Sequence, residues 1–141
     1  MGLIQESHKN VIRKKLSGLK EQVSIVYFTQ DMECAFCRET REMLEEVTAL
    51  SDKLRLQVFD FQRDKGEVEK YRVDKIPAIV IQNGRDYGIR FYGVPAGYEF
   101  ATLLEDLMMI SHGDSGLSRQ SREALKLLKA PAHIQVFVTP T

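Results

Sequence analysis

The sequence predicts an α/β domain with a mixed four-stranded sheet flanked by helices. Three observations carry this prediction: short apolar runs, apolar residues at helical spacing between them, and an Asn83-Gly84 turn that joins two of the runs. Strand–helix–strand order implies a parallel pair, and the hairpin adds antiparallel strands. The chain has 141 residues, 43% of them hydrophobic and 28% charged, which is enough apolar material for a compact core.

Helices and strands alternate in the first half of the chain. Residues 3–18 form an expected amphipathic helix, and the run 23–29 is an expected buried strand. A second helix is expected to begin near Cys34, and a second strand covers residues 54–59. The inner stripe of the first helix is predicted to hold Ile4, Val11, Ile12, Leu16 and Leu19, with His8 on the same face.

The second half adds a short helix over residues 65–71, a hairpin and a final helix. Ile76-Pro77 leads into the first hairpin strand at 78–81, and the return strand covers 87–92. Apolar residues from Phe100 to Met108 predict the last helix of this unit, which Gly113 ends.

Residues 114–141 repeat the pattern that opens the chain. A linker leads to a helix capped by Ser118 and then to a strand over 133–139, which matches residues 25–29 at its end. We therefore expect a first unit at 1–113, and at 114–141 the linker, helix and first strand of a truncated second unit. The alternative is an ordinary C-terminal helix and edge strand. The truncated-unit interpretation predicts that 134–138 is an unpaired edge, disordered, or paired with another molecule.

Composition excludes several classes of function. Lys+Arg and Asp+Glu both number 20, so no basic excess indicates nucleic-acid binding. Apolar runs are too short for a membrane span, and the first residues do not resemble a secretory leader. The expected location is the cytoplasm, where two cysteines spaced C-x-x-C indicate catalysis or metal binding.

Cys34-Ala35-Phe36-Cys37 follows an expected buried strand and opens an expected helix. Unpaired N–H groups and the helix dipole stabilise a thiolate at such a position, so Cys34 is the candidate exposed nucleophile and Cys37 the resolving thiol. Arg38 favours the thiolate, whereas Asp31 and Glu33 oppose it. Zinc needs two more ligands, and neither a third cysteine nor suitably spaced histidines supply them; a cluster shared between two chains is the remaining metal alternative.

Ile76-Pro77 stands just before a strand, where a proline costs little in ladder hydrogen bonds. A cis peptide here could hold the Ile76 backbone open for an incoming substrate strand. The alternative is a trans proline that only starts the strand.

Taken together, these motifs resemble the thioredoxin/glutaredoxin fold. The stretches 91–100 and 136–141 are similar to the two-unit, glutaredoxin-like protein disulfide oxidoreductases, best known from thermophiles. The resemblance implies a redox-active disulfide with no other cofactor, in which Cys34 is the nucleophile and Cys37 resolves. It also implies that Pro77 is a cis-proline opposite the disulfide, that Ile76 contacts substrate through its backbone, and that Ala35 and Phe36 line the same site.

Two departures from that family accompany the resemblance. Glutaredoxins usually carry Pro-Tyr between the cysteines, where this chain has Ala35-Phe36. Thioredoxins carry a buried acid six residues before the first cysteine, and Phe28 occupies that place. Asp60 is a candidate substitute, although a helix cap or a solvated loop acid is the favoured interpretation.

The other polar residues are expected to be structural. His8, His112 and His133 have no metal-ligand spacing, and Glu42, Glu45 and Glu46 are expected to form a solvated helix face.

The expected function is thiol–disulfide exchange with protein disulfide or dithiol substrates. A thioredoxin-reductase-like or other electron donor is expected to supply the electrons. One alternative is a non-catalytic thioredoxin-like binding module. Another is an electron-relay unit of a peroxide-reducing system. The net direction of exchange depends on the reduction potential.

Overall fold

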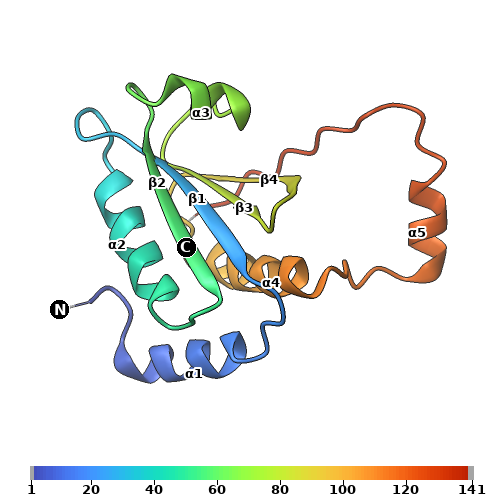
Figure 1. The fold of residues 1–141 in the computed structure, drawn as a ribbon, viewed down its shortest axis with the longest axis horizontal. Coiled ribbons are helices and arrows are strands. Elements are labelled where there is room, and N and C mark those ends of the chain that lie inside the picture. Colours follow the sequence, from blue (N-terminus) through green and yellow to red (C-terminus); the bar gives the residue numbers. More distant parts are fainter. Residues whose placement is uncertain (1, 140–141) are drawn as a thin grey trace.

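The structure, a computed structural model, describes residues 2–139 and contains the predicted mixed sheet (Figure 1). Its strands are β1 (Val23–Thr29), β2 (Leu54–Asp60), β3 (Ala78–Gln82) and β4 (Asp86–Tyr92). They lie in the order β2-β1-β3-β4; β1 and β2 are parallel, and the other two pairs are antiparallel. The predicted α/β fold is therefore confirmed, and each of these strands lies within about two residues of its expected position.

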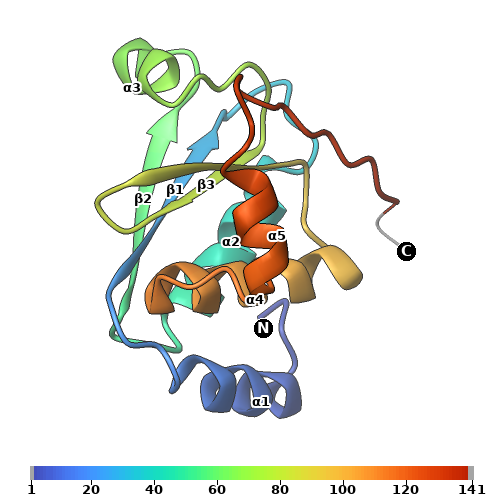
Figure 2. The same cartoon turned by 90° about the vertical axis from the view of Figure 1, so that its right-hand side faces the viewer.

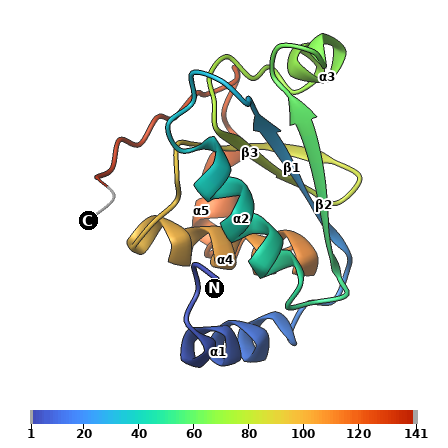
Figure 3. The same cartoon turned by 90° about the vertical axis from the view of Figure 1, so that its left-hand side faces the viewer.

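Helices cover both faces of the sheet. One face packs against α1 (Glu6–Leu16), α2 (Cys37–Thr48) and α4 (Tyr98–His112), and the other face packs against α3 (Lys65–Lys70). Figures 2 and 3 show α2 and α4 on one side of the sheet, with α3 near the opposite end of the strands from α1. Gly113 ends α4 in the left-handed conformation, as predicted.

The central strand β1 is buried on both faces, which explains its unbroken apolar sequence. Ile25 and Tyr27 point into the core beneath α2 and α4, and Val26 and Phe28 point into the core beside α3. Each fully buried side chain of this size contributes about 1.5–3 kcal/mol to folding. The strand therefore fixes the place at which its carboxyl end, and the cysteine loop that follows, leave the core.

The buried face of α1 differs from the predicted stripe. Ile12 and Leu16, one turn apart, are buried, but Val11 is 69% exposed and His8 is also exposed. Adjacent residues on a helix point about 100° apart, so Val11 cannot share the narrow contact that Ile12 makes with the core. The prediction was wrong for Val11, which lies beside the buried stripe, and for His8, which lies one turn before Ile12 where the start of the helix is exposed.

The segment after Gly113 leaves the body of the molecule (Figure 1). The Ser118 side chain accepts a hydrogen bond from the Ser121 N–H at the start of α5 (Arg119–Leu125), as predicted. The strand expected at 133–139 is not formed, because a strand needs a neighbour for its backbone groups and residues 134–138 have no sheet partner within 2–139. Ile134, Val136 and Phe137 are accordingly exposed. Pro140 and Thr141, part of the family-like stretch, lie outside the described residues.

Among residues 2–139, no helix is both long and apolar enough to cross a membrane.

Candidate active site

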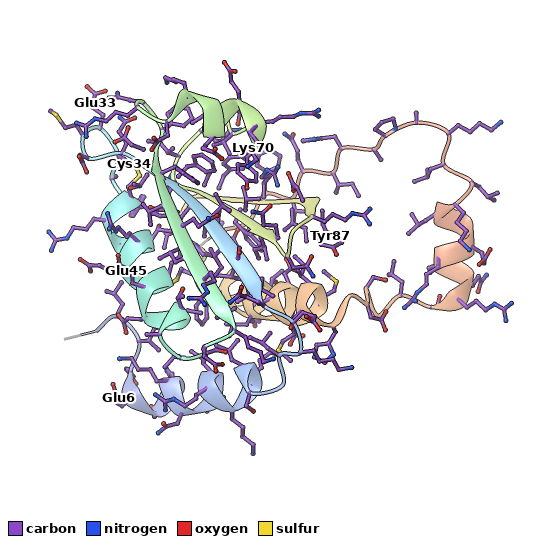
Figure 4. The ribbon with its side chains drawn as sticks, viewed as in Figure 1. Glu6, Glu33, Cys34, Glu45, Lys70 and Tyr87 are labelled. Carbon is purple, nitrogen blue, oxygen red and sulfur yellow. A yellow bond between two sulfur atoms is a disulfide. The ribbon has the colours of Figure 1, made fainter. Side chains whose placement is uncertain are left out.

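Cys34 and Cys37 form a disulfide at the carboxyl end of β1, where the chain turns into α2 (Figure 4). Their Cα atoms are 5.5 Å apart. Cys34 is partly exposed, whereas only 1% of Cys37 is exposed. The two cysteines therefore differ in access: Cys34 lies partly at the surface, and Cys37 lies in the core.

The helix that carries the pair begins at Cys37 rather than near Cys34. Ala35 and Phe36 form a turn, and Phe36 is the N-cap with a non-helical backbone (φ −117°, ψ 6°). Phenylalanine has no side-chain acceptor, so the first-turn N–H groups of α2 are not capped by that side chain. Those N–H groups and the positive end of the helix dipole lie beside the cysteines, where they stabilise a thiolate.

Charged residues around the disulfide are mostly exposed. The Arg38 side chain is 92% exposed, and its Nε donates to Glu42 Oε1 at 2.9 Å. Asp31 and Glu33 are exposed as well. Water and salt screen charges in such positions, so the predicted competition between Arg38 and the two acids is weak, and the helix N-terminus is the main local source of positive potential.

Pro77 lies at the same end of the sheet as the disulfide. Ala78 pairs with Phe28 across β3 and β1, so Pro77 stands opposite the end of β1. The Ile76–Pro77 peptide bond is cis, and the C=O of the buried Pro77 accepts a hydrogen bond from the Gly93 N–H at 2.9 Å. Within residues 2–139, no hydrogen bond engages the N–H or C=O of the partly exposed Ile76.

Two hydroxyl groups lie behind Cys37, and neither was predicted from the sequence. Tyr27 is fully buried and its hydroxyl donates to the Cys37 C=O at 2.6 Å. Thr40, one turn further along α2, is also fully buried, and its Oγ1 has no hydrogen-bond partner among the described residues. The available signal was the spacing of Thr40 three residues after Cys37, which places the two on one helix face.

Phe28, which occupies the place of the buried acid of thioredoxins, packs on the side of the sheet away from α2. Its ring lies 5.7 Å from that of Phe59 and 5.9 Å from that of Tyr71. Asp60 stabilises a turn: its Oδ1 accepts from the N–H groups of Gln62 and Arg63, each at 2.9 Å. Asp60 therefore stabilises the turn after β2 and caps no helix, since the N-cap of α3 is Asp64.

The predicted solvated acidic face of α2 is only partly correct. Glu42 and Glu45 pair with arginines one turn earlier, but Glu46 accepts hydrogen bonds from the N–H groups of Leu3 and Ile4 and pairs with Lys9 at 3.2 Å. Burial opposes the charged form, yet these hydrogen bonds and the Lys9 ammonium outweigh it, so the pKa of Glu46 is lowered. The prediction failed for Glu46 because its partners come from a segment more than 35 residues away.

The histidines do not gather around the disulfide. His112 Nε2 lies 2.8 Å from the Gly18 C=O, which joins the end of α4 to the turn after α1. Within residues 2–139, no three His, Cys, Asp or Glu side chains are arranged to hold a metal ion.

Comparisons with known proteins agree with this geometry. Residues 12–108 match the family described as thioredoxin-like domain. The crystal structure of a protein disulfide oxidoreductase from Aeropyrum pernix K1 superposes with a TM-score of 0.88 at 27% identity, covering 96% of this chain and 60% of that one.

Other matches are to parts of larger proteins. The alkyl hydroperoxide reductase component AhpF from Xanthomonas campestris pv. phaseoli is 29% identical over 99 residues, which are 70% of this chain and 16% of that protein. A structure of AhpF from Enterococcus faecalis has a TM-score of 0.78 at 20% identity, over 89% of this chain and 61% of that one. The chain thus spans less than two thirds of these relatives.

Proposed function

The chain belongs to the thioredoxin-like domain family, and from that premise we propose that it exchanges dithiols and disulfides with protein substrates through Cys34 and Cys37. The observation that carries the proposal is the unequal exposure of the two bonded cysteines at the start of α2. A disulfide with one reachable and one buried sulfur is suited to exchange, because a partner attacks or is attacked at one sulfur only.

In the reducing direction the Cys34 thiolate attacks one sulfur of a substrate disulfide. The substrate S–S bond breaks, a mixed disulfide forms on Cys34, and one substrate thiolate leaves and takes a proton from solvent. Cys37 then loses its proton to solvent and attacks the Cys34 sulfur, which re-forms the Cys34–Cys37 bond. The second substrate thiolate leaves and is protonated, so two electrons pass from the protein to the substrate. The two protons that the substrate thiolates take up come from solvent, which receives one proton from Cys37.

The substrate contacts are proposed to come from both sides of the disulfide. Ile76 offers backbone groups that the described chain leaves unused, next to the buried Pro77. Ala35 is exposed and Phe36 is 51% exposed on the other side. An extended substrate segment can therefore hydrogen-bond at Ile76 while its apolar side chains rest on Phe36.

Insulin reduction in the presence of a small dithiol tests the proposal. The unaltered protein accelerates precipitation of the insulin B chain, and Cys34→Ser abolishes the acceleration. Cys37→Ser accumulates mixed disulfides on Cys34, detected by mass and released by dithiol. Absence of both the acceleration and the adducts would refute the exchange function. Partner capture that is equal for Cys34→Ser and the unaltered protein would favour the non-catalytic binding module instead.

A second candidate function is electron relay, which the similarity to alkyl hydroperoxide reductase AhpF favours. In that role the Cys34–Cys37 disulfide accepts electrons from a thioredoxin-reductase-like flavoprotein and passes them to the disulfide of a peroxidase. NADH oxidation with such a flavoprotein, a peroxidase and peroxide distinguishes the roles. Relay requires turnover that depends on Cys34 in this mixture, whereas general exchange shows turnover with insulin as well.

We also propose that the redox unit ends at Gly113 and that residues 114–139 belong to a second thioredoxin-like unit. In support, α5 has no buried residue and the apolar side chains at 134–138 are exposed.

A further inference from the structure

The hydroxyl pair behind Cys37 has no role in the exchange steps given above. Tyr27 projects from β1 and Thr40 from α2, and both are fully buried. Burial of a hydroxyl without a hydrogen bond is unfavourable, so an unpartnered Thr40 Oγ1 requires an explanation.

Thr40 Oγ1 makes no hydrogen bond to either of two neighbouring groups in this structure. The Phe36 C=O, which a helical threonine often uses, accepts the Thr40 N–H at 3.0 Å but nothing from the Thr40 hydroxyl. The Tyr27 hydroxyl gives its one hydrogen to the Cys37 C=O at 2.6 Å and so donates nothing to Thr40. Burial raises the pKa of Tyr27, while the neighbouring hydroxyls of Thr29 and Thr40 work against that rise, which places the Thr40 hydroxyl beside the phenol.

Cys37 and Thr40 are three residues apart on α2, where side-chain Cβ atoms are about 5–6 Å apart. In the oxidised state described here the Cys37 sulfur is bonded to Cys34 and carries no hydrogen. Reduction turns that sulfur into a buried thiol, which is a weak donor, or a thiolate, which is a strong acceptor. A hydroxyl can serve both forms, because it accepts from S–H and donates to S⁻.

We propose that Thr40 is a positioning residue for the resolving cysteine, its hydroxyl becoming the hydrogen-bond partner of the Cys37 sulfur when the disulfide is opened. The inference rests on the proposed exchange function. In the reduced protein Thr40 Oγ1 accepts from the Cys37 S–H. As Cys37 loses its proton to solvent and attacks the Cys34 sulfur of a mixed disulfide, the hydroxyl turns to donate to the developing thiolate. The substrate thiolate that leaves is protonated, and Thr40 itself gains and loses no atoms.

The proposal fixes the sign of a change in reduction potential. Thr40→Val keeps the shape of the side chain, removes the partner of the reduced sulfur, and removes the unpartnered hydroxyl of the oxidised state. Both effects disfavour reduction. We expect the equilibrium constant for reduction by glutathione to fall about tenfold, the effect of one net hydrogen bond, which is a potential about 30 mV more reducing.

Two matched variants control the measurement. Thr40→Ser restores the hydroxyl and is expected to restore the potential to within about twofold of the unaltered equilibrium constant. Thr48→Val makes the same substitution further along α2, where the hydroxyl donates to the Leu44 C=O, and leaves the potential unchanged. A Thr40→Val potential equal to that of the unaltered protein, or a Thr48→Val shift as large as that of Thr40→Val, overturns the inference.

The same titration separates this inference from the exchange function. Failure of the unaltered protein to equilibrate with glutathione refutes the exchange function itself, whereas equilibration with no effect of Thr40→Val refutes only the role of Thr40. If Thr40→Val does not fold, reduced Cys34→Ser, whose remaining thiol is Cys37, gives a second measurement. Its infrared S–H band is expected at a lower frequency than that of a thiol in an apolar solvent, and a band at the apolar-solvent position overturns the proposal.

Discussion

Replacing Tyr27 with phenylalanine removes one buried hydroxyl and leaves the aromatic ring in the core. That hydroxyl donates to the Cys37 C=O at 2.6 Å. A buried neutral hydrogen bond contributes about 1 kcal/mol, and the desolvated carbonyl left behind adds a fraction more. We therefore expect Tyr27→Phe to lower the free energy of unfolding by about 1–1.5 kcal/mol. For a domain of this size the loss moves the urea midpoint by about 0.6 M.

The assay is urea unfolding at pH 7, followed by far-UV circular dichroism on both the oxidised and the reduced protein. Burial raises the pKa of Tyr27, so the phenol remains a donor at this pH. The acceptor is a backbone carbonyl that takes no part in exchange, so the same loss is expected in both redox states. Tyr87→Phe is the control, because Tyr87 lies on the exposed hairpin and its change stays within about 0.5 kcal/mol. No loss, or a loss in one redox state only, would refute the reasoning.

Three further predictions concern the scaffold. In urea titrations, Ile12→Ala is expected to lower the free energy of unfolding by about 2–4 kcal/mol, and Val11→Ala, at the exposed neighbouring position, to change it by less than about 0.5 kcal/mol. Similar losses of unfolding free energy in the two variants would contradict the assignment of Ile12 to the buried face of α1. Because the pKa of Glu46 is lowered in the folded protein, its carboxylate stabilises the fold above the ordinary glutamate pKa of about 4.3, and this stability is lost as pH falls through the folded-state pKa. Glu46→Gln is therefore expected to lower Tm at pH 7 but not at pH 2. A difference in Tm that is the same at both pH values would oppose this account. Limited trypsin digestion cuts first at Arg119 or Arg122, in the exposed segment beyond Gly113, and leaves a resistant fragment ending near that segment; early cuts within 6–112 argue against the proposed boundary.

Local pattern was enough to predict the sheet and the disulfide. β1 is apolar on both faces because it is the central strand, and Asn83-Gly84 marks the hairpin between β3 and β4. The C-x-x-C spacing after β1 predicted which sulfur is exposed and which is buried. These features depend on residues close together in sequence, which is why periodicity and turn chemistry reveal them.

Contacts between distant segments could not be predicted in the same way. Glu46 was expected in solvent, yet it holds the backbone before α1. Tyr27 looks like one more strand residue until the packing of α2 on β1 brings its hydroxyl to Cys37. The strand expected at 133–139 failed for a related reason: local β propensity cannot supply a partner strand.

The cysteine loop projects beyond the last residues of β1 that take part in the sheet, and its exposed positions, Asp31, Met32, Glu33, Ala35 and Phe36, add nothing to either core. Substitutions there leave the scaffold intact, so the choice of partner can diverge among descendants of this sequence without loss of foldability. Cys37 and the hydroxyls behind it lie inside the packed layers and have no such freedom. Partner choice can therefore vary at the exposed positions before Cys34 without cost to the core, whereas Phe36 belongs both to the partner surface and, as the N-cap of α2, to the helix end that stabilises a thiolate, so a substitution there changes both properties.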